Sequence, residues 1–297
     1  MKNPEPVDVH SPDAQRTFPS GINVWLNSTI SCAGGQVRGL LTIWRRHLLR
    51  RPRHRLFYVV MTDFPFDKLT DHLSPTWRHV LPFVAWLVLM TLLPEAAWSY
   101  AVRAGTGLAL FLWLRPWAGY PRVSRQDVFW GIPAGIFVFV VWVLPEASSV
   151  VERFPGFYDT YLLFGFLPPW KAAEPSMATF YAPESCGWFL SIIRLAGSAV
   201  VIAVIEEFFW RGFLYRWIQD PRFTEVSLAT FSVPAFAGMV LLFGVEHQRW
   251  LAGIAAGAVY GGLMIGCRSI WAPAIAHVVT NLLLGIYVLA TGSYQFW

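Results

Sequence analysis

Charge is scarce in this 297-residue chain. Asp, Glu, Lys and Arg together make up 14% of it, whereas 55% of the residues are hydrophobic and 16% are aromatic. Because a soluble globular domain is about a quarter charged, this composition excludes an ordinary water-soluble protein. It predicts an all-α, polytopic bundle of about seven or eight transmembrane helices. The net charge of +5 does not indicate a nucleic-acid partner, because the basic residues gather where membrane topology would place them.

Cysteine is scarce as well. Cys32, Cys186 and Cys267 are odd in number and far apart in the sequence. This spacing excludes both a disulfide framework and a cysteine-based metal motif, so we expect ordinary thiols. The start of the chain also lacks the basic segment, apolar run and cleavage site that define a signal peptide.

Residues 1–75 are predicted to be a cytoplasmic N-terminal extension, and 76–297 the membrane-embedded domain. Residues 1–37 are polar, rich in Pro, Ser and Asp, and without a period, so we expect disorder there. Residues 38–55 carry seven Arg among Leu, Ile and Trp. That pattern suits either a basic amphipathic segment on an anionic cytoplasmic leaflet or a solvated charge run.

Seven apolar runs follow, each near the ~20 residues that a helix needs to cross a bilayer. They are 79–94, 96–114, 127–145, 187–205 (or on to 218), 228–246, 251–267 and 271–290. A polar, aromatic and Pro-rich loop, 146–186, separates the third run from the fourth. Its stretch YLLFGFLPPW suits a segment that dips into the membrane interface.

Charges on the connecting segments predict the topology. Basic residues follow the second and sixth runs: Arg115, Arg122, Arg125 and Arg268. Acidic residues occupy the other loops: Glu95, Glu146, Glu152, Glu174 and Glu184. By the positive-inside rule, the N-terminus and the loops at 115–126 and 268 are cytoplasmic, and the C-terminus faces the far side.

This topology contains a conflict. It places Glu206 near the cytoplasmic end of its helix, but His247 near the opposite end of the next helix. If the two residues cooperate, 219–233 cannot be a simple turn into a full span, and one helix boundary must be wrong.

Two adjacent carboxylates end the fourth apolar run, in the stretch VIEEFFWRGFLYRW. A charged group at the bilayer centre costs about 2.5–3.5 kcal/mol on insertion scales. Glu207 and Arg211 are i,i+4 and can neutralise each other. Glu206 points about 100° away, so its carboxylate is the better candidate for chemistry. The alternative is that both carboxylates are ordinary helix-end charges in the cytoplasmic interface.

Two later helices also carry polar groups that hydrocarbon would reject. Phe243 and His247 are i,i+4 at the end of one, and His277 and Asn281 are i,i+4 inside the other. A lone membrane histidine more often packs than binds a ligand. Three successive helices with such groups, beside the small-residue stretch GIAAGAVYGG that permits close helix approach, predict convergence on one buried, wet site.

This set of side chains suits hydrolysis of an acyl bond. A carboxylate and an imidazole can take a proton from water, while a second imidazole and a carboxamide stabilise an oxyanion. Alternatively, Glu206, His247, His277 and Asn281 could hold a divalent metal such as Zn²⁺ that activates the water. The sequence pairs no Ser or Cys with a His at matching depth, which disfavours an acyl-enzyme.

Three motifs lie in a fixed order on separate apolar helices: Glu206-Glu207-x-x-x-Arg211, Phe243-x-x-x-His247 and His277-x-x-x-Asn281. The set resembles the CPBP family, which contains the type II CAAX prenyl endopeptidases and the bacterial abortive-infection and bacteriocin-processing proteins. All three motifs match without substitution, over about residues 186–297. The resemblance implies an intramembrane peptidase acting near the membrane-anchored C-terminus of a protein or peptide substrate.

The resemblance also implies roles for the motif residues. Glu206 and His247 would activate the water, and His277 and Asn281 would hold the oxyanion or a metal. Glu207 and Arg211 would support them. The broad motif gives no role to Glu246.

The closing portion is similar to a narrower group. The segments RGFLYRW, EHQRWLAGIAAGAVYG, AHVVTN and TGSYQFW resemble the CAAX-protease-related proteins of bacteria with exosortase/PEP-CTERM sorting systems. This resemblance implies a multi-pass protein of the bacterial cytoplasmic membrane.

Two other functions remain open. One is a proton- or ion-coupled transporter, in which intramembrane carboxylates and histidines relay charge. The sequence has no inverted repeat and no matching pair of Gly/Pro-broken helices, which argues against it. The other is a non-catalytic immunity or scaffold protein of the same fold, against which the intact motifs argue.

Overall fold

The structure is a computed structural model that describes residues 73–174 and 176–297. The chain divides into two units, Met1–Phe64 and Pro65–Trp297, and every described residue belongs to the second. The predictions for 1–37 and 38–55, and for Cys32, lie outside the described residues. Cys186 and Cys267 are both free thiols.

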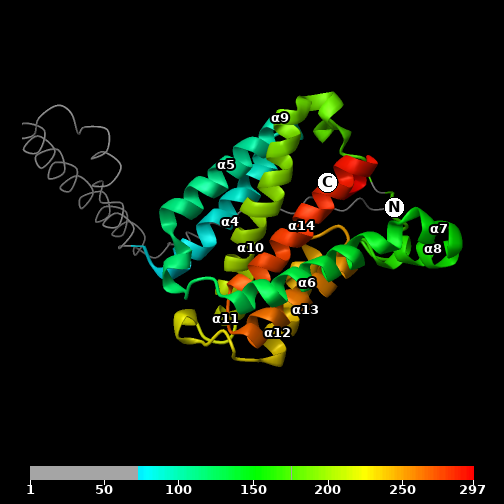
Figure 1. The fold of residues 1–297 in the computed structure, drawn as a ribbon. Coiled ribbons are helices and arrows are strands. Elements are labelled where there is room, and N and C mark those ends of the chain that lie inside the picture. Colours follow the sequence, from blue (N-terminus) through cyan, green and yellow to red (C-terminus); the bar gives the residue numbers. More distant parts are fainter. Residues whose placement is uncertain (1–72, 175) are drawn as a thin grey trace, which may run out of the picture. The chain divides into compact units, whose positions relative to one another are not determined.

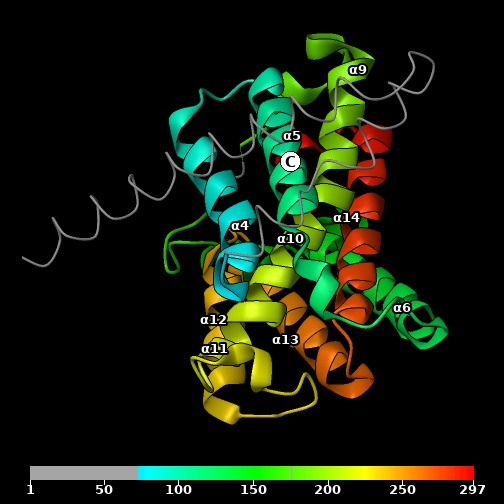
Figure 2. The same cartoon turned by 90° about the vertical axis from the view of Figure 1, so that its left-hand side faces the viewer.

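The described part of the chain is all-helical and contains no strand, which confirms the predicted fold class. Figures 1 and 2 show helices packed in pairs, with α4 beside α5, α6 beside α14 and α12 beside α13. The α-helices are α4 (Pro75–Leu92), α5 (Ala97–Leu114), α6 (Arg125–Val143), α7 (Ser148–Arg153), α8 (Pro155–Phe164), α9 (Pro183–Ala196), α10 (Ala203–Glu207), α11 (Tyr215–Trp217), α12 (Val233–Val245), α13 (Trp250–Cys267) and α14 (Trp271–Thr291).

Four of the described helical segments are long and apolar enough to cross a membrane: Arg125–Glu146, Pro183–Trp217, Trp250–Cys267 and Trp271–Thr291. Helices α4, α5 and α12 coincide with three further predicted runs but are not among these four. The protein is thus a multi-pass helical membrane protein. Only four of its seven predicted spans lie in described helices that meet the length and hydropathy needed to cross a membrane.

The fourth predicted run forms the helical segment Pro183–Trp217, which comprises α9, α10 and α11 and is kinked at Gly187, where the backbone is not helical. The longer of the two expected versions, ending near 218, is therefore correct. Two stretches of π-helix, Gly197–Ile202 and Phe208–Leu214, interrupt it on either side of α10. Inserted π turns are rare and often occur at functional sites. Here they flank the two adjacent glutamates, and no local pattern in the sequence predicts them.

The prediction of a full span over 228–246 is wrong. Helix α12 has 13 residues, Val233–Val245, with Pro234 in its first turn, so it is only about 20 Å long. Residues 228–232 form a turn and extended chain. The Tyr215 hydroxyl donates to the Thr230 carbonyl oxygen at 2.7 Å, which holds this segment against the end of the long helix.

The short α12 resolves the topological conflict. Glu206 lies about 16 Å along the helix from Trp217, and His247 lies about 21 Å from Val233, since an α-helix rises 1.5 Å per residue. The Tyr215–Thr230 hydrogen bond keeps the C-terminal end of the long helix close to the start of α12. Glu206 and His247 therefore lie at similar distances from that end of the bundle. On the other side of Glu206 the helical segment continues back to the kink at Gly187.

The segment 146–186 is less irregular than predicted, because it contains α7 and α8. It is attached to the turn between α12 and α13. The Leu167 amide donates to the Gln248 carbonyl oxygen at 2.8 Å, and the Trp250 indole N–H donates to the Phe164 carbonyl oxygen at 2.7 Å. The loop thus contributes to the position of the turn that carries His247.

Close packing of α6 on α14 depends on glycine. A Cβ atom on Gly131 would lie 2.9 Å from the Ala272 carbonyl oxygen, and one on Gly135 would overlap the Ala276 carbonyl oxygen. The Thr280 hydroxyl, at 2.9 Å, donates to the Gly135 carbonyl oxygen. Small residues let membrane helices approach in this way, and here they bring α14, with His277, into the centre of the bundle.

We expect Gly135→Ala to destabilise the protein by about 1–3 kcal/mol, because the new methyl group forces the two backbones apart. The matched control is Gly105→Ala on α5, where a Cβ meets nothing within 4 Å. Thermal unfolding in detergent would measure both variants. Equal midpoints for Gly135→Ala and Gly105→Ala would contradict this account of the α6–α14 contact.

Candidate functional site

A buried ion-pair assembly lies at the centre of the described bundle. Glu207 and Arg211 are both 0% exposed, and the Arg211 Nη1 atom lies 3.1 Å from the Glu207 Oε1 atom. This is the pairing predicted from the i,i+4 spacing. His277, from α14, brings its Nδ1 atom to 2.9 Å from the same carboxylate oxygen. Since a carboxylate only accepts, Nδ1 carries the hydrogen and the Nε2 atom faces away from Glu207.

Glu206 lies beside this assembly but outside it. Its Oε2 atom is 3.9 Å from the His277 Nε2 atom. That oxygen is buried and has no hydrogen-bond partner among the described residues. Buried carboxylate oxygens are normally paired, because desolvation is costly. A single water molecule could contact both atoms across this distance.

His247 follows the C-terminus of α12 and is half-buried. Its Nδ1 atom lies 2.8 Å from the Phe243 carbonyl oxygen. That carbonyl can only accept, so His247 also carries its hydrogen on Nδ1 and leaves the Nε2 lone pair free. Both histidines therefore have the same tautomer, each fixed by a different partner.

Phe243 is the common neighbour of the separate groups. Its ring centroid is 4.8 Å from the ring of His247, 6.0 Å from that of His277 and 4.2 Å from the Arg211 guanidinium. Tyr260 stacks on the His277 ring at 5.0 Å. These aromatic walls exclude water from the ion pair and restrict the orientation of both imidazoles.

Asn281 is placed differently from the expectation for an oxyanion donor. Its amide nitrogen donates to the Ser198 carbonyl oxygen at 2.9 Å, within the first π-helical stretch. A π turn frees backbone carbonyl oxygens from the normal helical pattern, and Asn281 supplies one of the missing donors. Its second N–H and its carbonyl oxygen are not committed by this contact.

A second buried ion pair fixes the turn next to His247. Arg249 and Glu146 are almost fully buried, and Arg249 Nη2 lies 2.9 Å from Glu146 Oε2. The Arg249 Nη1 atom donates to the Gln295 carbonyl oxygen at 2.9 Å. The end of α6, the α12–α13 turn and the C-terminal segment are thus joined through one guanidinium. Burial and the nearby Glu146 carboxylate raise the pKa of Tyr161, so its phenol remains neutral beside this pair.

The suggested metal ligands do not form a metal site as placed. Within 73–174 and 176–297, no three His, Cys, Asp or Glu side chains come close enough to share an ion. The histidine tautomers would suit ligation, because a metal-binding imidazole usually donates its other N–H to a carboxylate or carbonyl oxygen. As placed, however, the described donors do not form a ligating group, so no step below is assigned to a metal.

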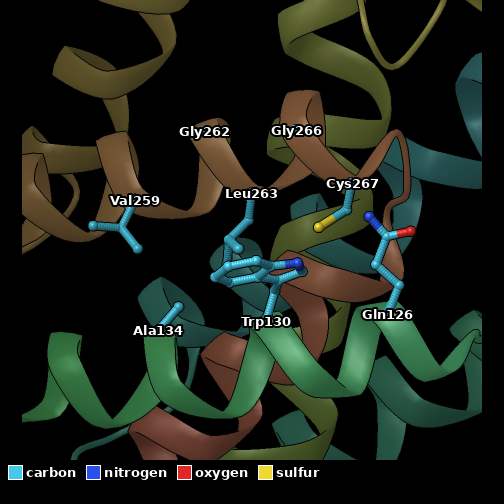
Figure 3. Close-up of a pocket in the computed structure, with 8 residues that line it drawn as sticks. All are labelled: Gln126, Trp130, Ala134, Val259, Gly262, Leu263, Gly266 and Cys267. Carbon is cyan, nitrogen blue, oxygen red and sulfur yellow. The ribbon is translucent and has the colours of Figure 1, made fainter.

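A surface groove in the described part of the chain lies elsewhere. It has a volume of about 410 Å³ and runs between α6 and α13 (Figure 3). Its lining residues are Gln126, Trp130, Ala134, Val259, Gly262, Leu263, Gly266 and Cys267. None of them belongs to the three motifs, so the groove is not part of the candidate site.

Sequence reasoning missed several residues that build the site. Ser198, Tyr260 and the Arg249–Glu146 pair carry no motif, and their partners lie far away in the chain. The clearest missed signal was Arg249, an arginine two residues after His247. Glu246, the extra acid, is exposed at the end of α12, but it lies close enough to Glu206 and Arg211 to interact with both electrostatically.

The comparisons with known proteins agree with these motifs. Residues 188–283 match a family model, Rce1-like, described as type II CAAX prenyl endopeptidase Rce1-like. The matched segment is under half of the chain but contains all three motifs. It supports a relationship with the CPBP family and a peptidase function in general. No curated protein and no solved structure gives a match.

Replacing Arg211 by Ala should destabilise the protein by about 3–5 kcal/mol, because it leaves Glu207 as a buried charge without its cation. The control is Arg222→Ala, since the Arg222 side chain is 71% exposed and pairs with Asp220 and Glu225 on the surface. Such exposed pairs contribute about 0–1 kcal/mol. Folded yield and thermal midpoint in detergent would be compared. If the Arg211 variant unfolds like wild type, the arginine has a direct role with substrate instead.

Proposed function

We propose that the protein is an intramembrane endopeptidase that hydrolyses a peptide bond near the membrane-anchored C-terminus of its substrate. The observation that carries this proposal is the buried Glu206 carboxylate oxygen, which has no hydrogen-bond partner within residues 73–174 and 176–297 and lies beside the His277 imidazole. The match to a protease family over 188–283 supports peptide hydrolysis over other reactions that a carboxylate and an imidazole can perform.

In the proposed mechanism Glu206 is the general base. It takes a proton from a water molecule whose oxygen attacks the scissile carbonyl carbon. The free Nε2 lone pair of His247 accepts the other water hydrogen and so orients the molecule. When the tetrahedral intermediate collapses, the C–N bond breaks and the proton on Glu206 passes to the leaving amine.

His277 and Asn281 are assigned to the oxyanion. The His277 Nδ1–H donates to Glu207, so a protonated ring would present its Nε2–H to the developing negative charge. Glu207 would stabilise that imidazolium, as a carboxylate does for histidine in serine hydrolases. Asn281 can add its second N–H. Arg211 holds the Glu207 carboxylate in position and keeps its charge compensated throughout.

The substrate class and the location follow from the resemblance. We propose that substrates are membrane-anchored proteins or peptides, and that the enzyme resides in the bacterial cytoplasmic membrane with its N-terminus in the cytoplasm. The link to exosortase sorting systems stays a prediction based on the C-terminal segments.

Glu206→Gln tests the proposal directly, since it keeps the size of the side chain and removes the base. Turnover should fall by about 10²–10⁴, the usual contribution of a general base, while the thermal midpoint stays close to wild type. Glu225→Gln is the control, because Glu225 is exposed on the surface. Membranes containing each form would be compared by mass spectrometry for newly released C-terminal peptides. Identical products from wild type and Glu206→Gln would refute the assignment.

Metal dependence has its own test. We propose that the protein groups activate water without a metal ion, because the described donors are not within ligating distance. Enzyme dialysed against a chelator should therefore retain its activity and contain no stoichiometric metal. Loss of activity that Zn²⁺ restores would overturn this proposal without affecting the assignment of Glu206. This test is cleaner than Asn281→Asp, which would also remove the bond to the Ser198 carbonyl oxygen.

A further inference from the structure

Two arginines lie between α5 and α9, away from the three motifs. Helices α5 and α9 run side by side in Figures 1 and 2. Arg103, on α5, has its guanidinium carbon 5.3 Å from the centroid of the Tyr100 ring, and that of Arg194, on α9, lies 4.2 Å from the same centroid. The two cations thus share one aromatic ring, and Arg194 also contacts the rings of Tyr181 and Trp297.

Neither arginine forms an ion pair with any described carboxylate. This distinguishes them from Arg211 and Arg249, which each have a buried acidic partner. Cation–π contacts with the aromatic rings compensate part of the charge. They leave the N–H donors in the plane of the guanidinium free, because the aromatic ring contacts the face.

The cluster is rich in donors and poor in acceptors. The Nε atoms of Arg103 and Arg194 are buried and have no hydrogen-bond partner among the described residues. Arg103 Nη2 donates to the Tyr181 hydroxyl at 3.3 Å, and Arg194 interacts with the oxygen of Tyr100. Because arginine has five donors and no acceptor, this arrangement lacks an oxygen-rich anion.

The surroundings indicate which anion. Both arginines are only partly buried, and the apolar residues beside them face outward on the same two helices. Val102 is 42% exposed and Ile192 is 54% exposed, and Trp98 and Trp188 are exposed nearby. Tryptophan favours the level of the lipid headgroups. An anion with apolar chains attached would therefore pair with the two cations and also cover the exposed apolar side chains beside them.

We propose that Arg103 and Arg194 bind the phosphate of an anionic phospholipid, whose acyl chains lie along the exposed faces of α5 and α9. Guanidinium groups match phosphate oxygens in paired, charge-assisted hydrogen bonds. The Tyr100 hydroxyl supplies a further donor. The site is distinct from the candidate catalytic site and does not depend on the proposed peptidase function.

Native mass spectrometry of the purified full chain would test the site. The probes are dioleoylphosphatidylglycerol and dioleoylphosphatidylcholine at equal concentration. Wild type should retain the anionic lipid preferentially, and Arg103→Gln/Arg194→Gln should reduce that preference at least about tenfold. The matched control is Arg125→Gln/Arg268→Gln, which removes two exposed arginines at the ends of α6 and α13. An equal loss in both double variants would refute a specific site.

A second measurement needs no variant and so does not depend on folding of the mutant. Wild type in phosphatidylcholine nanodiscs would be treated with phenylglyoxal, and again in nanodiscs containing phosphatidylglycerol. Arg103 and Arg194 should be modified severalfold more slowly with the anionic lipid, whereas Arg222 should not change. Equal rates would overturn the proposal. So would protection by a peptide with a free C-terminal carboxylate but not by the lipid, which would identify the cluster as a peptide site.

Discussion

The candidate site depends on one interaction, the buried contact of Glu207 with both Arg211 and His277. Three helical segments meet there, because Glu207 and Arg211 lie on the long 183–217 segment, His277 comes from α14, and Arg211 donates to the Gly257 carbonyl oxygen of α13 at 3.3 Å. A carboxylate with two cationic or donor partners can remain charged in a low-dielectric interior, whereas a single unpaired one cannot. Glu207 already neutralises Arg211, so the Glu206 carboxylate is not needed for an ion pair with that arginine.

The geometry of the helices brings this assembly together with His247. The 183–217 segment is longer than a simple span and α12 is shorter, so residues that a uniform bundle would place at different depths reach the same level. The π-helical stretches on both sides of α10 alter the rotation of the helix around the glutamates. Asn281 stabilises the first of these stretches through Ser198. The irregular backbone and the buried polar groups are thus parts of one arrangement, in which each requires the other.

The sequence was sufficient for the fold class and for the Glu207–Arg211 pair, because both follow from local periodicity. Apolar runs of helical length and an i,i+4 spacing do not depend on distant contacts. It was insufficient for the length of α12, which is limited by Pro234 and by the contact of Tyr215 with Thr230. It could not give the partner of Asn281 either, since Ser198 lies 83 residues away in the chain on another helical segment. Those features arise from tertiary packing, which no local pattern records.

The arginines of the bundle illustrate how the same side chain is accommodated in three ways. Arg211 is neutralised by an acid one turn away, and its role is to maintain a charged carboxylate. Arg249 is neutralised by Glu146 from a distant loop, and joins that loop to the turn next to His247. Arg103 and Arg194 have aromatic faces but no acid in the described chain. An unpaired cation among apolar helices is costly unless the membrane itself supplies the counter-ion. A phospholipid phosphate is the anion that the membrane offers at a partly exposed position, so the lipid would complete the charge balance that the chain leaves open between α5 and α9.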